Sequence, residues 1–370
     1  MGAALLNPGK TGAEDFPNIV FILADDLGYG DIKCLNPAGK IPTPHLDRLA
    51  AIGMIFTDAH SSSSVCTPTR YGLLTGRYNW RSRLKNGVLG GFSLRLIETG
   101  RLTVPALLKQ HGYETACLGK WHVGQDWPLK DGGFAKDYDD GWKVDYMKPI
   151  LTGPTALGFD YFFGLSASLD MPPHVFIEND LATGIPTVEK KWIRAGPAHA
   201  SFESIDVLPV LANRAVLYID RQAAKGGGAG PLFLYFALTA THTPILPRAD
   251  WQGKSSVNDY ADFVMQVDWT VGLVLESLER NGLRENTLVI FTSDNGCYPA
   301  AKFPELAAKG HHPSLQFRGH KADIFEGGHR IPFIARWPGK IKAGRVSRQL
   351  ICLTDLMATC AEIIRGEAAG

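Results

Sequence analysis

Asn18-Ile-Val-Phe-Ile-Leu-Ala24 is an almost unbroken apolar run that ends directly in Asp25-Asp26. Continuous hydrophobicity, without polar residues at alternate positions, indicates a strand that is buried on both faces. Further strand candidates, each rich in apolar or β-branched residues, lie at 113–118, 231–238, 287–292 and 331–337. The opening run is therefore predicted to be one of several strands in a covered sheet.

Segments with helical spacing of apolar residues separate these predicted strands. The clearest is 260–278, where apolar side chains recur every three or four residues. Other predicted helices are 44–53, 102–111, 205–224 and 353–364. Strands that alternate with helices form a mostly parallel sheet covered on both faces, and ligands bind beyond the carboxyl ends of its strands. We therefore predict an α/β fold with its site at that edge.

Composition narrows the class of protein. Hydrophobic residues make up 45% and charged residues 20% of the 370 residues, which is typical of a globular enzyme. The net charge is +1 and no block of like charge is present, so we expect neither nucleic acid nor a membrane surface as partner. The apolar runs are too short to span a bilayer.

The sequence does not decide the cellular compartment of the protein. Residues 1–16 lack the basic start and long apolar stretch of a signal peptide. This pattern fits a cytoplasmic protein, or a periplasmic or secreted one whose leader has been removed. The six cysteines include no CxxC pair, which argues against zinc and redox motifs but leaves disulfides undecided.

Polar clusters follow three of the predicted strands. They are Asp25-Asp26, Thr241-His242 and Asp294-Asn295. Each alone is better explained as a turn or a helix cap. Together at one sheet edge, carboxylate and amide oxygens form a site that suits Ca²⁺ or Mg²⁺.

Cys66 precedes another predicted helix. Thr67 is a favourable N-cap and Pro68 suits the first helical position, so the helix is predicted to start there. Cys66 would then face the positive end of the helix dipole, with Arg70 one turn further on. A buried cysteine without a chemical role is the alternative at this point.

The motif around Cys66 carries a family resemblance. Cys66-Thr-Pro-Thr-Arg70 with Leu74-Thr-Gly-Arg77 resembles the signature of the type I sulfatases, in the alkaline phosphatase superfamily. Further segments that resemble motifs of this family, in the family's order, are Asn18–Asp31, Thr43–Ala50, Gly119–His122, Thr241–Pro244, Ser293–Gly296, Arg318–Lys321 and Glu326–Gly328. The similarity covers about residues 17–365 and extends to the N-acetylgalactosamine 6-sulfatase-like and arylsulfatase A-like groups.

The resemblance implies a site and its cofactors. The catalytic residues would be Cys66, Arg70, Lys120, His122, His242 and Lys321, of which Lys120, His242 and Lys321 also bind substrate. The metal ligands would be Asp25, Asp26, Asp294, Asn295 and the residue at 66. The implied cofactors are Ca²⁺, with Mg²⁺ possible, and Cα-formylglycine made from Cys66 by a formylglycine-generating enzyme. Asp294 would also lie where it can take the nucleophile's proton.

The resemblance also implies an architecture. We expect an alkaline-phosphatase-like three-layer sandwich with a large, mostly parallel mixed sheet. The sulfatase catalytic domain would span 17–365, between an N-terminal extension at 1–16 and a tail at 366–370. The C-terminal antiparallel subdomain of the family is expected to be largely missing, which would leave an edge uncovered and favour self-association or low stability.

The implied activity is hydrolysis of sulfate esters, with a sulfated carbohydrate as substrate. Residues 125–199, rich in aromatic and turn residues, are expected to be an irregular insertion that forms the pocket rim. One loop holds Lys309, His311, His312 and His320. These side chains either contact the substrate or are exposed to solvent without a role in the site. The alternatives in function are a phosphate or phosphonate monoester hydrolase and a non-catalytic protein that binds sulfated glycans.

Overall fold

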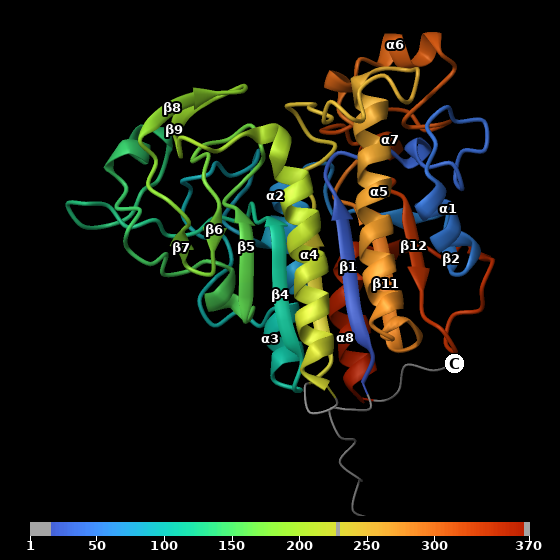
Figure 1. Cartoon of the computed structure of the whole chain (residues 1–370), viewed down its shortest axis with the longest axis horizontal. Helices are drawn as coiled ribbons and strands as arrows, with labels where there is room; N and C mark the ends of the chain where they lie inside the picture. Colours follow the sequence, from blue (N-terminus) through green and yellow to red (C-terminus); the bar gives the residue numbers. More distant parts are fainter. Residues whose placement is uncertain (1–15, 227–229, 366–370) are drawn as a thin grey trace, which may run out of the picture.

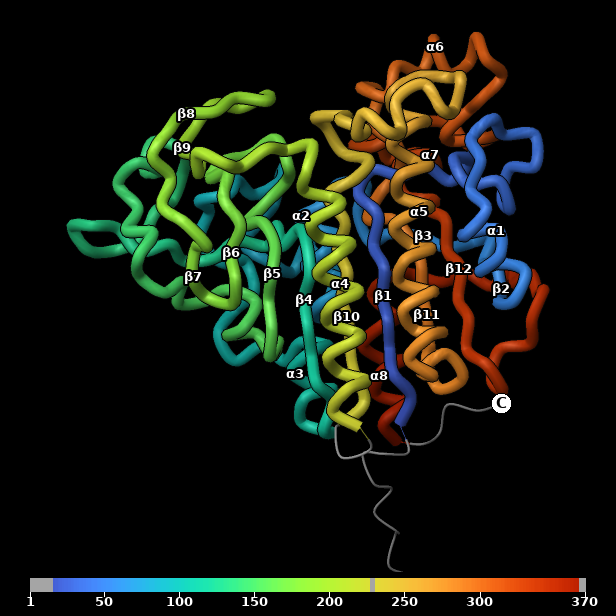
Figure 2. The backbone as a smooth tube through the Cα atoms, in the orientation of Figure 1, coloured from blue at the N-terminus to red at the C-terminus, as the bar shows by residue number. Residues whose placement is uncertain are grey.

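The apolar run near the start of the chain forms β1 (Asn18–Ala24), which lies in the middle of the sheet. The computed structural model describes residues 16–226 and 230–365. β1 lies between β10 (Leu232–Ala237) and β11 (Thr287–Ser293) and runs parallel to both. Every residue of these three strands is buried, as the continuous apolar runs predicted. Figure 2 shows β1, in blue, among segments that come much later in the chain.

The main sheet has ten strands in the order β13-β2-β12-β11-β1-β10-β4-β5-β6-β7. β4 (Glu114–Lys120) and β5 (Tyr161–Leu165) continue the parallel arrangement, whereas β12 (Phe333–Arg336) is antiparallel to β11. The remaining strands of this sheet are β2 (Met54–Phe56), β6 (Ile177–Glu178), β7 (Leu181–Ala182) and β13 (Arg345–Ser347). Two small sheets pair β3 (Ala59–His60) with β14 (Ile351–Cys352), and β8 (Val188–Lys191) with β9 (Ala195–Ala198).

Helices cover both faces of the sheet, which gives three layers (Figure 1). One layer holds α1 (Pro44–Ala51), α4 (Val207–Ala224) and α5 (Asp259–Arg280). The other holds α2 (Cys66–Thr75), α3 (Val104–Lys109) and α8 (Leu356–Arg365). Alternate residues of β1 enter the two cores, Val20 and Ile22 on the first side, Phe21 and Leu23 on the second. The predicted three-layer fold is confirmed.

Two short helices, α6 (Phe303–Ala308) and α7 (Glu326–His329), lie beyond the end of the sheet at which β1 finishes (Figure 1). In the described residues no helix combines the length and the apolarity needed to cross a bilayer. All six cysteines are free. Of the predicted N-terminal extension only Phe16 is described, and the predicted tail lies outside the described residues.

The predicted start of α2 is wrong. The helix begins at Cys66, and its N-cap is Val65, in an extended conformation without a side-chain cap. The hydroxyl of Thr67 instead accepts a hydrogen bond from the main-chain nitrogen of Leu89, 3.1 Å away. Pro68 is therefore the third helical residue, a position whose missing N–H would have no partner within the helix in any case.

The expectation that 125–199 is an irregular insertion is also wrong in part. β5 belongs to the main sheet, and β6 and β7 extend it. Trp127 and Tyr146 are buried in the core on the face of the sheet that α2, α3 and α8 cover, so these aromatic side chains contribute to packing. Phe134, Tyr138 and Trp142 are exposed, as a pocket rim requires.

Candidate active site

The carboxyl ends of four neighbouring strands deliver polar side chains to one place. Asp25 and Asp26 follow β1, and Asp294 and Asn295 follow β11. β10 leads to His242, and β4 ends in Lys120 with His122 close behind. All of these residues are buried, although each belongs to a residue type that is normally exposed or only partly buried. The predicted site therefore assembles where the sheet topology requires it.

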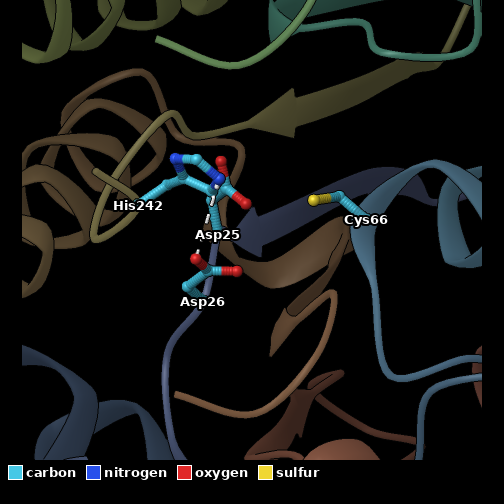
Figure 3. Close-up of side chains that lie close together, drawn as sticks. All are labelled: Asp25, Asp26, Cys66 and His242. Carbon is cyan, nitrogen blue, oxygen red and sulfur yellow. Dashed lines mark ion pairs between the residues drawn. The ribbon is translucent and has the colours of Figure 1, made fainter. Parts of the chain in front are cut away.

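Cys66 faces this edge from the first position of α2. Figure 3 shows its sulfur directed toward Asp25, Asp26 and His242, which come from the end of β1 and the loop after β10. One ligand atom from each of these four residues lies within 4.8 Å of the others. The structure thus brings His242 into the group of possible ligands as well as into the predicted catalytic set.

Buried cations lie against the carboxylates. The Nζ atom of Lys120 is 2.7 and 2.9 Å from the two carboxylate oxygens of Asp25. Lys321 approaches Asp26 equally closely, at 2.7 and 2.8 Å. Removal of one partner from a buried ion pair leaves the other charge unneutralised, which strongly destabilises the folded protein. Each lysine is therefore needed to neutralise its carboxylate.

Arg70 forms the third buried ion pair. Its Nη2 and Nε atoms donate to the same oxygen of Asp294, at 2.7 and 3.1 Å, and Nη1 donates to the carbonyl of Lys120 at 2.9 Å. Burial, reinforced by Asp25, raises the pKa of Asp294 to about 7 despite Arg70. Arg70 thereby connects α2 with the ends of β4 and β11.

The charge around Cys66 favours its anionic form. Burial alone would raise the pKa of the Cys66 thiol, but Lys120 and Lys321 outweigh burial and hold the pKa well below its ordinary value. Low thiol pKa values next to cations are typical of cysteines with a chemical role. The structure therefore favours the functional interpretation of Cys66 over a packing role.

The two histidines have opposite protonation preferences. Burial and the charge of Lys120 lower the pKa of His122 to about 4. For His242, burial acts in the same direction, but the carboxylates of Asp26 and Asp25 prevail and raise its pKa to about 9. One histidine is thus neutral and the other protonated at neutral pH, a division that suits a base and an acid in one site.

The geometry of His242 and His122 is held by the main chain. Nδ1 of His242 donates to the carbonyl of Thr243 at 2.6 Å, which turns Nε2 toward Asp26, 3.8 Å away. Nε2 of His122 donates to the carbonyl of Leu89 at 2.7 Å. The remaining nitrogens are Nε2 of His242 and Nδ1 of His122, and the latter lies 3.4 Å from the hydroxyl of Ser168.

The backbone around these groups needs special conformations. Asp26 and His122 have φ of 63° and 58°, in the left-handed region that non-glycine residues rarely occupy. Gly119 has φ of 105°, and a Cβ atom there would lie 1.8 Å from the carbonyl oxygen of Ala237. Only glycine permits this approach of β4 to β10, which carries Lys120 into the site.

The residues present fit a hard divalent cation. Asn295 donates through Nδ2 to Asp26 at 2.7 Å, and its Oδ1 is buried without a hydrogen-bond partner among the described residues. Asp294 accepts from the main-chain nitrogen of Asp26 through Oδ1 at 3.2 Å. An unsatisfied buried amide oxygen beside carboxylates is the kind of donor set that Ca²⁺ or Mg²⁺ binds. Asp294 and Asn295 therefore both contact Asp26, which lies in the group formed with Asp25 and Cys66.

Asp170 is a candidate residue that sequence reasoning did not assign. It is buried, Oδ2 pairs with Arg194, and Oδ1 lies 3.8 Å from Nδ1 of His242 without a hydrogen-bond partner among the described residues. Its stretch of sequence, 168–174, lies within the predicted rim. Only the path of the chain after β5 places this carboxylate beside His242.

The loop with Lys309, His311, His312 and His320 does not act as one group. His311 is buried, and its Nε2 atom lies 2.9 Å from Asp31. Its other ring nitrogen accepts from the main chain of Lys40 at 3.2 Å. These contacts hold the loop in place, so His311 serves the structure of the loop.

The family model described as "Sulfatase" matches residues 17–366. An N-acetylgalactosamine-6-O-sulfatase of Bacteroides thetaiotaomicron is 33% identical over 94% of this chain and 73% of its own length. An N-acetylgalactosamine-6-sulfatase of Rattus norvegicus is 34% identical over 94% of this chain. A solved structure from work on the metabolism of multiple glycosaminoglycans by Bacteroides thetaiotaomicron has 33% identity and a TM-score of 0.83, over 95% of this chain and 78% of that one.

The chain spans only part of the length of these proteins. It covers 62% of the rat N-acetylgalactosamine-6-sulfatase. The matched part holds all the residues that converge at the end of the sheet, because the last of them, Lys321, lies well before residue 366.

Proposed function

The chain belongs to the sulfatase family, whose members depend in general on a metal ion and on formylglycine, and we propose that it hydrolyses sulfate esters of a carbohydrate. One observation carries the proposal. Cys66 begins a helix and lies close to two carboxylates and His242, and each of these carboxylates is paired with a buried lysine. A non-catalytic protein that binds sulfated sugars would need the cations but would have no use for this thiol.

Two groups supplied after synthesis complete the site. Conversion of Cys66 to Cα-formylglycine by a formylglycine-generating enzyme would provide the attacking oxygen of a hydrated aldehyde. Calcium, with magnesium as the second choice, would be held by Asp25, Asp26, Asp294, Asn295 and the residue at 66. Its charge would offset the crowded carboxylates and favour ionised oxygen at position 66.

The chain's own cations bind the sulfate group. Lys120, Lys321 and Arg70 are fixed by ion pairs to the carboxylates, so their charge is in place before substrate arrives. Preorganised positive charge stabilises the charge that spreads over the sulfate oxygens during transfer. A site with one divalent metal ion also suits a monoanionic sulfate ester better than it suits a dianionic phosphate ester.

The histidines are suited to proton transfer. His242, protonated at neutral pH, would give its proton to the leaving alcohol. His122, neutral at the same pH, would accept a proton from the group at position 66, because it lies near enough to help lower the pKa of the Cys66 thiol. The opposite shifts in pKa support His242 as the acid and His122 as the base.

A sugar with a 6-sulfate is the substrate class that we favour, with N-acetylgalactosamine 6-sulfate as the first candidate. The names of the two relatives support this class. The unpaired Oδ1 of Asp170, beside His242, would accept a hydrogen bond from a sugar hydroxyl.

Coexpression with a formylglycine-generating enzyme tests the proposal. Mass spectrometry of the peptide with Cys66 should show the aldehyde, and the enzyme should hydrolyse an aryl sulfate. Cys66→Ala should abolish turnover, whereas Cys34→Ala, which removes a cysteine outside the site, should retain it. An active Cys66→Ala variant would refute the assignment.

Two further assays define the substrate. The ratio of kcat/KM for matched aryl sulfate and aryl phosphate esters should strongly favour sulfate. Release of sulfate from N-acetylgalactosamine 6-sulfate should exceed release from its 4-sulfate isomer. A preference for phosphate would instead establish a phosphate or phosphonate monoester hydrolase.

A further inference from the structure

A second group of side chains with metal-ligating atoms lies between β3 and α7, outside the proposed catalytic set. It consists of His60, Glu326 and His329, and one ligand atom from each lies within 4.8 Å of the others. The two histidines are 269 residues apart in sequence, yet their Nδ1 atoms are 2.9 Å apart. All three residues are partly exposed, so an ion can reach them from solvent.

The outer nitrogens of both rings face atoms that can only accept a hydrogen bond. Nε2 of His60 lies 2.8 Å from the carboxylate of Asp58, and Nε2 of His329 lies 3.1 Å from the carbonyl oxygen of Ile324. Each Nε2 must therefore carry its hydrogen. If both rings are neutral, each Nδ1 atom then carries a lone pair, and the two lone pairs point at each other.

A cation between the two Nδ1 atoms removes this conflict. It would bind both lone pairs, whereas a single shared proton would require one ring to be charged. The outer hydrogen bonds to a carboxylate and a carbonyl are also those that usually orient metal-bound histidines.

Glu326 supplies the third ligand. Arg330 contacts this carboxylate through Oε2 only, at 2.5 and 2.6 Å, which leaves Oε1 for an ion. Arg330 also pairs with Asp58. The two carboxylates and one guanidinium sum to one negative charge, so a divalent cation would meet a favourable local field.

We propose that His60, His329 and Glu326 bind one divalent transition-metal ion, with Zn²⁺ as the probe. Two imidazoles and a carboxylate are the ligands that Zn²⁺ takes in sites with one open position. Tetrahedral Zn–N bonds of about 2.0–2.1 Å place the two nitrogens about 3.3 Å apart, so the nitrogens need to separate by about 0.4 Å and the rings need to turn until both lone pairs meet at the ion.

The ion would connect the two segments that carry Cys66 and Lys321. β3 leads through 61–65 into Cys66, and α7 follows Lys321 after four residues. The segments already share hydrogen bonds, from Ser61 to the carbonyl of His329 and from Ala322 to the carbonyl of Ser64, both 2.9 Å. Metal binding would therefore strengthen an existing connection beside the catalytic site without contacting substrate.

Calorimetric titration of the calcium-loaded protein with Zn²⁺ tests the proposal. Excess calcium keeps the catalytic cluster occupied, and a parallel titration of Cys66→Ala shows whether zinc binds there instead. We expect one equivalent of zinc to bind with a Kd of micromolar or lower. His60→Ala and His329→Ala should each weaken binding at least tenfold, and His111→Ala, which removes an exposed histidine at the end of α3, should not.

Co²⁺ provides an independent readout of the ligands. Visible absorption of a tetrahedral cobalt site should appear in the parent protein and disappear in His329→Gln, a variant that keeps a polar side chain and guards against misfolding. Equal zinc binding in the parent and the histidine variants would overturn the proposal, as would binding that is lost only in Cys66→Ala. Absence of zinc binding altogether would leave a shared proton between the two rings and equally reject the metal site.

Discussion

The catalytic cluster and the His60–Glu326–His329 cluster both bring ligand atoms together from distant segments, but they differ in burial. Asp25, Asp26 and Cys66 are almost completely inaccessible, whereas the side chains of His60 and Glu326 are 16% and 41% exposed. Neighbouring charges are therefore screened little in the first cluster and strongly in the second.

The difference in burial separates two kinds of site, one in which fixed neighbours set protonation and one in which solvent takes part. In the buried cluster each carboxylate already has a partner cation, so protonation is set by fixed neighbours. In the exposed cluster solvent helps to set protonation, and a dissolved ion can compete with it. The catalytic cluster should consequently be sensitive to every change of charge, and the second cluster only mildly so.

The largest expected effect is on activity. Asp26→Ala removes a proposed calcium ligand and leaves Lys321 without its partner. Turnover of an aryl sulfate should fall about 10³-fold or more, because several kcal/mol of charge stabilisation are lost. Treatment of the parent enzyme with a chelator should have the same effect, and added calcium should restore the parent but not the variant.

The matched control for this prediction is His111→Ala, which should keep the parent rate. Full activity of the parent after exhaustive removal of calcium and magnesium would contradict the assignment. Full activity with zinc as the bound metal would contradict it as well.

The second prediction compares one arginine from each cluster. Arg70→Met leaves Asp294 buried without its cation, and unfolding by denaturant should show a loss of about 3–5 kcal/mol. Arg330→Met removes a partner of Asp58 and Glu326, whose side chains are 34% and 41% exposed. Arg330 itself is only 14% exposed, but solvent reaches both of its carboxylate partners, so the loss should be smaller than for Arg70→Met. Equal losses would show that burial does not separate the two clusters.

The third prediction uses a histidine that belongs to neither cluster. Burial lowers the pKa of His174 to about 4, and the ring packs against Trp192 and Phe202. Because the unfolded chain binds a proton near pH 6.5 and the folded chain only near pH 4, stability should fall as pH drops through this window. The full loss is about 3 kcal/mol.

Denaturant unfolding between pH 7 and 4 measures this loss. His174→Phe cannot be protonated, so its stability should depend less on pH over the same window. If the parent and the variant show the same dependence on pH, the histidine is not the cause. The result shows how a shift dominated by burial affects stability, against which both clusters can be compared.

Much of the architecture was predictable from local pattern. The apolar run of β1 required a strand covered on both faces, and the spacing in 260–278 required a long amphipathic helix, which became α5 (Asp259–Arg280). Asp25, Asp26, Asp294 and Asn295 could be placed at one edge because parallel strands finish there. The start of α2 was mispredicted, since Thr67 uses its hydroxyl for a distant main-chain group that local pattern does not reveal.

The site could be predicted wherever a motif and a strand end coincided, as for Lys120 and His122 after β4. Asp170 was not assigned because its approach to His242 depends on the path of the chain after β5. The pairing of His60 with His329 had no local signal either, since one ends a two-residue strand and the other a four-residue helix.

The sequence by itself determined the alternation of strands and helices, the residue types at the strand ends and the motif around Cys66. These features depend on interactions within a few residues, such as hydrophobic periodicity and backbone preference. Only the tertiary structure decided which buried cation neutralises which carboxylate, how the pKa values of His122 and His242 separate, and that His60 meets His329. Those outcomes depend on distances of a few ångströms between segments far apart in the chain, because Coulomb energy and desolvation change steeply over that range.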